Sequence, residues 1–197
     1  MKISNGIWAI ILAAGESKRM NRPKLIMPFG DRTIIENVIG NIPGNLVEGK
    51  IIVLGAWRNE ILEVISGLQV RHCINADYKM GMLSSVRCGI MALPDDAEAV
   101  IIYPGDQPGI PPGVTGTLIK EREETGKGII ISVHDGKRGH PVLIDKKYFS
   151  EINTLDDKQG LRELSVRHPE DIHEAETGST IILRDIDTLE DYLEATK

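Results

Sequence analysis

Hydrophobic positions along the chain follow two alternating patterns. Continuous apolar runs predict buried strands, and apolar residues at helical spacing predict amphipathic helices between them. The predicted strands cover residues 7–14, 50–56, 69–75, 97–106, 128–133, 139–144 and 179–187. The predicted helices cover residues 33–42, with Thr33 as N-cap, and 58–68, 83–93, 111–126, 156–168 and 188–196.

This alternation indicates an α/β fold, a doubly wound and mostly parallel sheet with right-handed crossovers. The strands at 128–133 and 139–144 flank the turn signal HDGKR, and we expect them to pair as a hairpin. Ligands bind at the carboxyl ends of the strands in such sheets. The functional residues are therefore expected after Ala14, Asn75, Tyr103 and Arg184.

Composition narrows the class of protein. The 197 residues suffice for one domain, which we expect to span 1–197, and the 41% of apolar residues allow a substantial core. The formal net charge of −6 argues against a general nucleic-acid-binding surface. The first apolar run lacks a signal-peptide layout and is too short to cross a membrane. Cys73 and Cys88 form no CxxC motif and are expected to be reduced thiols, which fits a cytoplasmic protein.

The loop after the first strand, LAAGESKRMNRPK (12–24), carries unusual positive charge for an acidic chain. Gly15 allows backbone amides to approach a phosphate closely, while Arg19 and Lys24 supply charge to a polyphosphate. Pro23 stiffens the chain before Lys24. The chain has neither a P-loop motif nor GxGxxG. The alternative is a solvated loop whose charges are incidental.

This loop resembles the nucleotidyltransferase signature L-A-A-G-x-S-x-R-M-G-x-P-K. Asn21 replaces the usual glycine, a mild change because Asn tolerates a left-handed backbone. The resemblance implies that the loop wraps a nucleoside triphosphate, that Arg19 and Lys24 bind its phosphates, and that the backbone near Ala14 reads the base. The implied nucleotide-binding residues of this loop are Leu12, Ala13, Ala14, Gly15, Arg19 and Lys24.

An acidic residue, Asp106, follows a predicted strand in the segment YPGDQPGI. A carboxylate that faces a phosphate loop suits Mg²⁺, which prefers one or two carboxylates together with phosphate oxygens. The alternative is that Asp106 caps the helix that begins near Pro111. In the related family the turn commonly reads G-D-M-P, and Gln107 here replaces the methionine.

A second carboxylate for the metal is expected in RDIDTLEDY, which resembles the family segment D-I-D-T-P-E-D. Asp185 and Asp187 lie two residues apart and so on one face of the predicted last strand. We favour Asp187 as the metal ligand, with Asp185 as the fallback. The alternative is that one of them caps the last helix, although Thr188 is also suited to that position.

Two later segments resemble molybdenum cofactor cytidylyltransferases in particular. NADYKMGMLSSVRCG (75–89) matches their N-x-x-(Y/W)-x-x-G-M-x-x-S-(L/V)-x-x-G pattern, and RGHPVLID contains their G-H-P-V-L. The match implies that His140 faces the acceptor, unless it is a structural turn residue. Serines at the start of a helix also serve as caps, so helix capping is the alternative role for Ser84 and Ser85. The implied nucleotide contacts of the first segment are Gly81, Met82, Ser84 and Ser85.

The resemblance, which covers 10–192, implies a Rossmann-like nucleotidyltransferase fold of GT-A type. It implies transfer of a cytidylyl group from CTP to the terminal phosphate of molybdenum-bound molybdopterin, with Mg²⁺ and with Lys24, Arg19 and Asp106 as catalytic residues. Ala14, where guanylyl-transferring relatives more often carry glycine, favours CTP. A molybdenum hydroxylase is the implied recipient of the product. The alternatives are guanylyl or other nucleotidyl transfer, to a sugar or polyol phosphate, or a cofactor chaperone without turnover.

Overall fold

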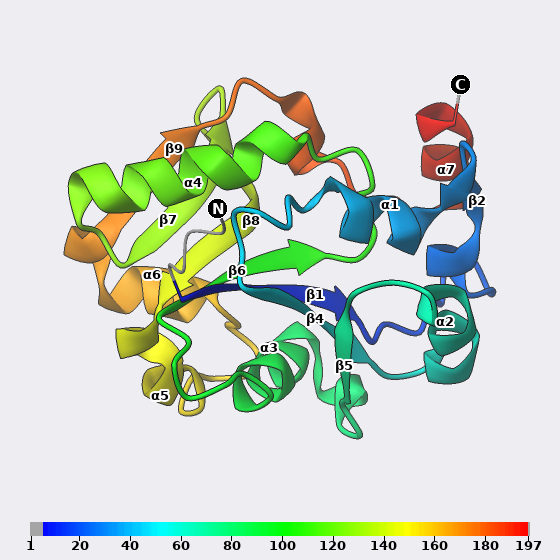
Figure 1. The fold of residues 1–197 in the computed structure, drawn as a ribbon, viewed down its shortest axis with the longest axis horizontal. Coiled ribbons are helices and arrows are strands. Elements are labelled where there is room, and N and C mark those ends of the chain that lie inside the picture. Colours follow the sequence, from blue (N-terminus) through cyan, green and yellow to red (C-terminus); the bar gives the residue numbers. More distant parts are fainter. Residues whose placement is uncertain (1–5, 197) are drawn as a thin grey trace.

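The protein was analysed as a computed structural model that describes residues 6–196. The ends of the predicted single domain, 1–5 and 197, lie outside these residues. A seven-stranded sheet runs in the order β5-β4-β1-β6-β8-β7-β9 (Figure 1). In this sheet β8 alone is antiparallel to its neighbours, so the expected doubly wound, mostly parallel fold is confirmed. The strands are β1 Ile7–Ala13, β4 Gly49–Leu54, β5 Arg71–Ile74, β6 Ala99–Pro104, β7 Ile129–His134, β8 Lys137–Asp145 and β9 Ile172–Glu176.

Helices cover both faces of the sheet, with α4 and α3 on opposite sides in Figure 1. One face packs against α1 Ile34–Asn41, α2 Arg58–Ile65 and α4 Pro112–Thr125. The other packs against α3 Met82–Met91, α5 Phe149–Ile152 and α6 Arg162–Arg167, and α7 Leu189–Ala195 follows near the end of the chain. Short 3₁₀ segments occupy η1 Lys24–Ile26, η2 Tyr78–Met80, η3 Lys146–Tyr148, η4 Pro169–Asp171 and η5 Thr180–Leu183.

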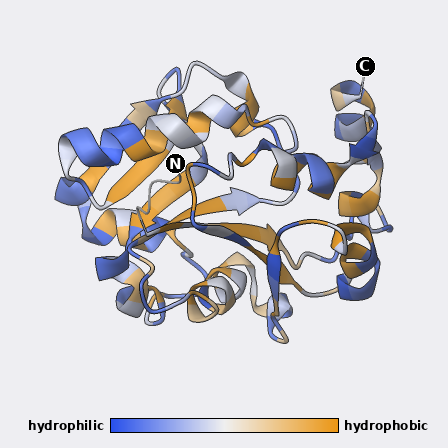
Figure 2. Cartoon of the chain, in the orientation of Figure 1, coloured by the Kyte–Doolittle hydropathy of each residue, from blue (hydrophilic) through white to orange (hydrophobic). Residues whose placement is uncertain are grey.

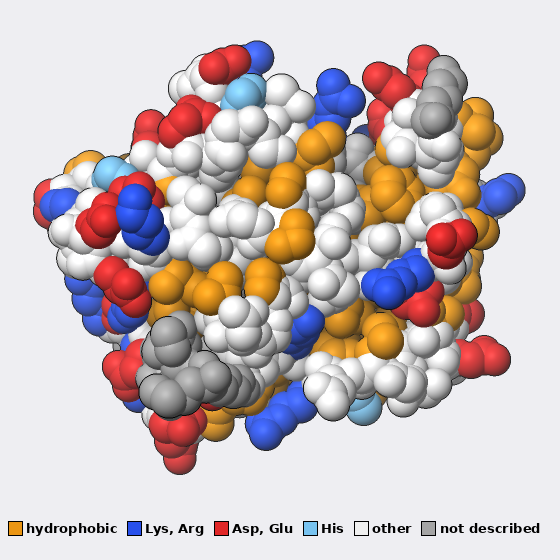
Figure 3. Space-filling model, turned by 45° about the horizontal axis from the view of Figure 1, so that its top comes forward, with side chains coloured by type: hydrophobic (Ala, Val, Ile, Leu, Met, Phe, Trp, Pro, Cys, Tyr) orange, Lys and Arg blue, Asp and Glu red, His pale blue; other side chains and the backbone are white. Residues whose placement is uncertain are grey.

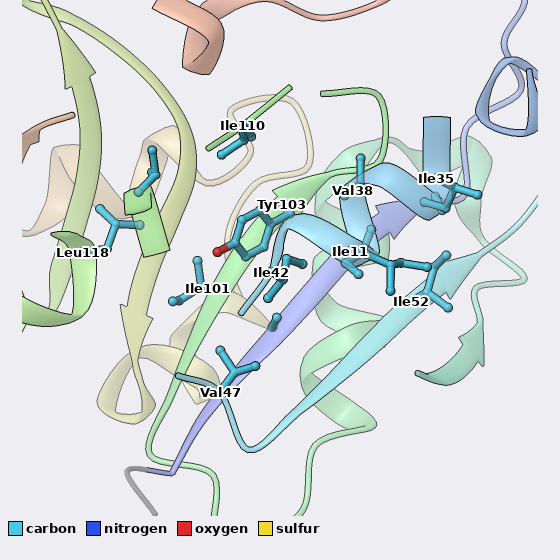
Figure 4. Packing of buried hydrophobic residues seen from close by; sticks show 14 of the residues in the cluster. Ile11, Ile35, Val38, Ile42, Val47, Ile52, Ile101, Tyr103, Ile110 and Leu118 are labelled. Atoms are coloured by element: carbon cyan, nitrogen blue, oxygen red, sulfur yellow. The ribbon is translucent and has the colours of Figure 1, made fainter. Parts of the chain in front are cut away.

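Alternation along each strand divides the core into two layers. In β1, Ile7, Ala9 and Ile11 face the α1 side, whereas Trp8 and Ile10 face the α3 side. Figure 2 shows the hydrophobic residues concentrated in the strands and on the helix sides that face them. Figure 4 shows the aliphatic packing of the first layer around Tyr103. Because helices cover both faces of the sheet, central strands such as β1 and β6 are apolar along their whole length, which is why the sequence pattern located them well.

The predicted cap of α1 is confirmed in detail. The Thr33 hydroxyl accepts a hydrogen bond from the backbone N–H of Glu36, and the Glu36 carboxylate accepts from the backbone N–H of Thr33. This capping box satisfies two backbone donors that the first helical turn would otherwise leave unpaired. It fixes α1 against the loop that precedes it.

We expect Thr33→Ala to lower the free energy of unfolding by about 1 kcal/mol, because it removes this cap. Urea denaturation of the two proteins measures the difference. Ser66→Ala is the matched control, since the Ser66 hydroxyl is exposed and bonds only to the Glu63 carbonyl. It should change stability by less than about 0.5 kcal/mol. Equal losses in the two variants would contradict the cap's contribution.

One predicted element is wrong, and a second is wrong in part. Residues 179–187 form no strand: η5 covers Thr180–Leu183, and the chain then runs on without strand pairing. This stretch is apolar because Ile182 is fully buried in the core layer that also contains α1 and α4. The predicted helix at 156–168 shortens to α6, because 156–161 form turns in which Gly160 has a positive φ of 62°.

The edge strand β9 and a two-residue hairpin, β2 Pro28–Phe29 with β3 Arg32–Thr33, were not predicted. β9 pairs in parallel with β7 but buries only Ala175 fully, so its sequence carries little hydrophobic signal. The hairpin strands are too short to show a period of two.

The surface mixes charges of both signs on the face drawn in Figure 3, where Lys and Arg side chains are scattered among Asp and Glu. Within residues 6–196, no helix is long and apolar enough to cross a membrane.

Candidate active site

A pocket of about 460 Å³ lies at the carboxyl ends of β1 and β6, where the parallel sheet was expected to bind its ligand. The first loop forms one wall, the start of α3 a second, and two aspartates a third. The proposed residues that line it are Leu12, Ala13, Ala14, Gly15, Arg19, Lys24, Gly81, Met82, Ser85, Asp106 and Asp187. Ser84 and His140 are not among its lining residues.

Two glycines bring the neighbouring turns against the end of β1. The Gly105 N–H donates to the Leu12 carbonyl at 2.9 Å, and a Cβ on Gly105 would lie 2.7 Å from that oxygen. A Cβ on Gly55 would lie 2.5 Å from the Ala14 carbonyl. Side chains at these two positions would push the turns apart. No Cβ clash arises at Gly15, so the space beside it is open toward the pocket.

The first loop turns through two residues with a left-handed backbone. Ser17 has a φ of 52° and Asn21 a φ of 50°, which confirms that Asn21 can take the place of the usual glycine. The N–H groups of Met20 and Asn21 both donate to the Ser17 carbonyl at 3.0 Å. The Trp57 indole also donates to the Glu16 carbonyl, so α2 holds the loop from outside.

Lys24 joins the first loop to both aspartates. Its Nζ lies 2.7 Å from Asp106 Oδ2, 3.0 Å from Asp187 Oδ1 and 2.8 Å from the Ile186 carbonyl. The Arg19 guanidinium contacts the other carboxylate oxygen of Asp187 at 2.6 Å. Lys24 and Asp187, which lie 163 positions apart in the sequence, therefore meet in one charged cluster.

The side chains of this cluster stabilise one another in their charged forms. Burial alone would lower the pKa of Lys24, but the charges and hydrogen bonds of Asp106 and Asp187 outweigh it and raise that pKa above its usual value. Burial would likewise raise the pKa of Asp187, but Lys24 and Arg19 hold it below the usual range. Lys24 is therefore cationic and Asp187 anionic at neutral pH.

Asp185 and Asp187 do not share a strand face, so that part of the prediction is wrong. Asp187 faces the pocket, whereas Asp185 Oδ1 accepts a hydrogen bond from Gln107 Nε2 at 2.6 Å. Burial and the nearby charge of Asp106 raise the pKa of Asp185. The Ile186 N–H donates to the Asp106 carbonyl at 3.1 Å, which fixes the chain before Asp187 beside the turn after β6.

The capping alternatives for the aspartates do not hold. Thr188 caps α7 in a capping box with Asp191, as the sequence allowed. No side chain caps the N-terminus of α4, so Asp106 does not serve there. Neither carboxylate is therefore used as a helix cap, and both face the cations of the first loop.

The donor set around Lys24 fits a divalent cation. Two carboxylates and one backbone carbonyl already surround a single positive charge, and such hard oxygen ligands suit Mg²⁺ or Mn²⁺. Within residues 6–196, no group of three or more His, Cys, Asp and Glu side chains could hold a metal by itself. A cation at this place needs further oxygen ligands, which water and the phosphates of a substrate can supply.

A buried asparagine holds the start of α3, a role that the sequence analysis missed. Asn75 Nδ2 donates to the hydroxyls of Ser84 and Ser85 at 2.9 and 3.0 Å, and its Oδ1 accepts from the Asp77 N–H. The Ser84 hydroxyl also donates to backbone carbonyls, including that of Gly81. Ser84 therefore positions the turn, while Ser85 reaches the pocket.

His140 lies beyond this pocket, at the start of the buried part of β8. Burial lowers the pKa of His140, while the charges of Asp185 and Asp106 oppose that effect. Its Nδ1 is buried and has no hydrogen-bond partner in residues 6–196.

Comparisons with known proteins agree with this architecture. Residues 9–172 match the family described as the MobA-like NTP transferase domain. A molybdenum cofactor cytidylyltransferase of Escherichia coli is 28% identical over 97% of this chain and 96% of its own length. A nucleotidyl transferase from Methanothermobacter superposes with a TM-score of 0.82 at 22% identity, covering 98% of this chain and 97% of its own. The Rv0371C protein of Mycobacterium tuberculosis, solved in complex with manganese, gives a TM-score of 0.80 at 20% identity. The match covers 96% of this chain and 97% of that protein's chain.

Proposed function

This chain belongs to the family of MobA-like NTP transferases, and on that premise we propose that it transfers a cytidylyl group from CTP to the terminal phosphate of molybdenum-bound molybdopterin. The products are molybdopterin cytosine dinucleotide and pyrophosphate. The observation that carries the proposal is the cluster of Lys24, Arg19, Asp106 and Asp187 at one end of the pocket. The likeness to the E. coli cytidylyltransferase along nearly the full chain supports the choice of substrates.

The first loop binds the donor nucleotide in this proposal. Ala14 and the open backbone at Gly15 face the pocket and approach the base and phosphates, while Arg19 and Lys24 offset the negative charge of the triphosphate. Without these two cations, Asp106 and Asp187 would repel the substrate. Both reactants are anions, so charge neutralisation and alignment supply most of the catalysis.

Asp106 and Asp187 are the residues that would hold a divalent cation. The bound metal supplies Lewis-acid stabilisation of charge on the reacting phosphates. Asp106 is suited to bind a metal because one of its carboxylate oxygens has no other partner among the described residues. Lys24 contacts Oδ2, whereas no residue from 6 to 196 donates a hydrogen bond to Oδ1. The chain needs no general base, since the attacking phosphate is already ionised at neutral pH.

A substrate screen tests this function. We expect pyrophosphate release with CTP and Mg²⁺ only when molybdenum cofactor is present, and at least about tenfold slower release with GTP or ATP. Faster turnover with GTP would replace the cytidylyl assignment by a guanylyl one. Turnover with a sugar phosphate but not with molybdenum cofactor would refute the acceptor. Tight cofactor binding with no pyrophosphate from any triphosphate would indicate a chaperone instead.

A further inference from the structure

Both cysteines of the chain meet in space, although 15 positions separate them in the sequence. Cys73 lies on the edge strand β5, and Cys88 lies on α3, which packs beside that strand (Figure 1). Their sulfur atoms lie 3.3 Å apart, and both residues are free, partly exposed thiols. Two thiols in contact on different elements lie within reach of a disulfide.

The two thiols differ in their hydrogen bonds and in their readiness to lose a proton. The Cys88 thiol donates to the sulfur of Cys73, and the Cys73 thiol donates to the Cys88 backbone carbonyl at 3.6 Å. Burial, together with the hydrogen bond and the charge of Cys88, raises the pKa of Cys73 to about 12. Cys73 therefore keeps its proton at neutral pH, and Cys88 is the thiol that meets an oxidant first.

The segment between the two cysteines forms one wall of the nucleotide pocket. Its residues that line the pocket are Tyr78, Gly81, Met82 and Ser85. Asn75, which directly follows β5, donates from Nδ2 to the hydroxyls of Ser84 and Ser85 at 2.9 and 3.0 Å. These hydrogen bonds join the end of β5 to the start of α3. A shift of β5 relative to α3 therefore reaches the pocket wall.

Of the two elements, β5 has more freedom to move. A Cβ on Gly89, the neighbour of Cys88, would lie 2.7 Å from a side-chain carbon of Ile10, so α3 packs tightly against β1. By contrast, β5 is an edge strand that pairs with β4, and its four residues are exposed or partly exposed. A bond between the two sulfurs would therefore draw β5 toward α3, and Asn75 would move with it.

We propose that Cys73 and Cys88 form a reversible disulfide when a low-molecular-weight disulfide oxidises them, and that this bond weakens nucleotide binding by displacing Asn75. The oxidation itself is independent of the proposed function. Its effect on CTP binding rests on that function, because it acts through the wall of the proposed nucleotide pocket.

The reaction is a thiol–disulfide exchange in two steps. The Cys88 thiolate attacks one sulfur of the oxidant, which forms a mixed disulfide and releases one thiolate. Cys73 then attacks the Cys88 sulfur and gives up its proton, and the second thiol of the oxidant leaves. The two cysteines together lose two electrons and two protons, and the oxidant is reduced to two thiols. An excess of a reducing thiol reverses both steps.

The test compares the full-length chain before and after incubation with glutathione disulfide. This oxidant exchanges with thiols and leaves the exposed side chain of Met82 unaltered. Mass spectrometry after alkylation with iodoacetamide should show a chain that has lost two hydrogens and takes up no alkyl group. The dissociation constant for CTP should rise about fivefold, the effect of losing one positioning hydrogen bond, and return to its first value after dithiothreitol.

Three variants separate the disulfide from other effects of the treatment. The double variant Cys73→Ser with Cys88→Ser cannot form the bond, so its dissociation constant for CTP should change less than about twofold on treatment. Cys73→Ala with Cys88→Ala is a second form of this control, and a thermal unfolding curve shows that each is folded. Asn75→Ala should reproduce the weaker CTP binding while both thiols are reduced, and oxidation should then weaken binding little further.

Each outcome decides one part of the inference. If the treated chain still alkylates at two thiols, or carries glutathione at both cysteines, the disulfide site is wrong. If the disulfide forms but CTP binds as before, or the double variants lose affinity equally, the link to the pocket wall is wrong. If the reduced chain binds no CTP, the proposed function fails and the effect on binding fails with it, whereas the thiol count still decides the disulfide.

Discussion

Lys24→Ala is expected to lower the turnover number by about a hundredfold or more, the loss that follows removal of one key electrostatic group from an active site. Lys24 is the cation that contacts both carboxylates, Asp106 at 2.7 Å and Asp187 at 3.0 Å. Its removal leaves two negative side chains with only Arg19 to offset them, and a triphosphate must then approach a net negative site. Pyrophosphate release at saturating CTP, Mg²⁺ and molybdenum cofactor measures the effect.

The comparison requires proof that the variant is folded, because the Lys24 side chain is only 12% exposed. A thermal unfolding curve supplies this proof. Lys120→Ala serves as the control, since Lys120 lies on the exposed side of α4, away from the pocket, and forms one long ion pair with Glu124 at 3.6 Å. It should retain full turnover. A folded Lys24→Ala variant with nearly intact turnover would show that the role given to Lys24 is wrong.

The second large effect is expected from Asp106→Ala. Loss of a metal ligand removes several kcal/mol of charge stabilisation, so turnover should fall by about three orders of magnitude. The remaining activity should no longer rise with Mg²⁺ concentration. Turnover measured across a series of Mg²⁺ concentrations, with Mn²⁺ as a second metal, gives both quantities.

Asp185→Ala is the matched comparison, because Asp185 lies close by but bonds to Gln107 and does not line the nucleotide pocket. Asp185→Ala should lower turnover by less than about tenfold, and the turnover of this variant should still depend on Mg²⁺. If Asp185→Ala loses that dependence while Asp187→Ala keeps it, Asp185 is the second ligand after all. An unchanged Mg²⁺ response in Asp106→Ala would refute the metal site itself.

The sequence predicted correctly those elements that a local residue pattern marks. The strand at 7–14 and the helix capped by Thr33 both appear with nearly the expected bounds, because burial on both sheet faces and a capping box leave clear patterns. The first loop and Asp106 were found together since each follows a strand of a parallel sheet. Their meeting at one edge follows from that topology.

Contacts between distant segments were harder to predict from the sequence. The expected strand at 179–187 would have placed Asp185 and Asp187 on one face, yet the chain there forms η5 and turns the two side chains to different partners. The role of Asn75 was also missed, because its hydrogen bonds to two serines depend on the packing of α3 against β5. No local pattern reports such contacts.

The central claim is that the cationic loop after β1 and the two aspartates act on one metal–triphosphate. The most direct measurement is a crystal structure with Mn²⁺ and a non-hydrolysable CTP analogue, in which anomalous scattering locates the metal. We predict a Mn²⁺ ion bound by Asp106, Asp187 and the analogue, with Arg19 and Lys24 on the phosphates. A metal bound to the phosphates but to neither aspartate, or a nucleotide outside this pocket, would contradict the claim.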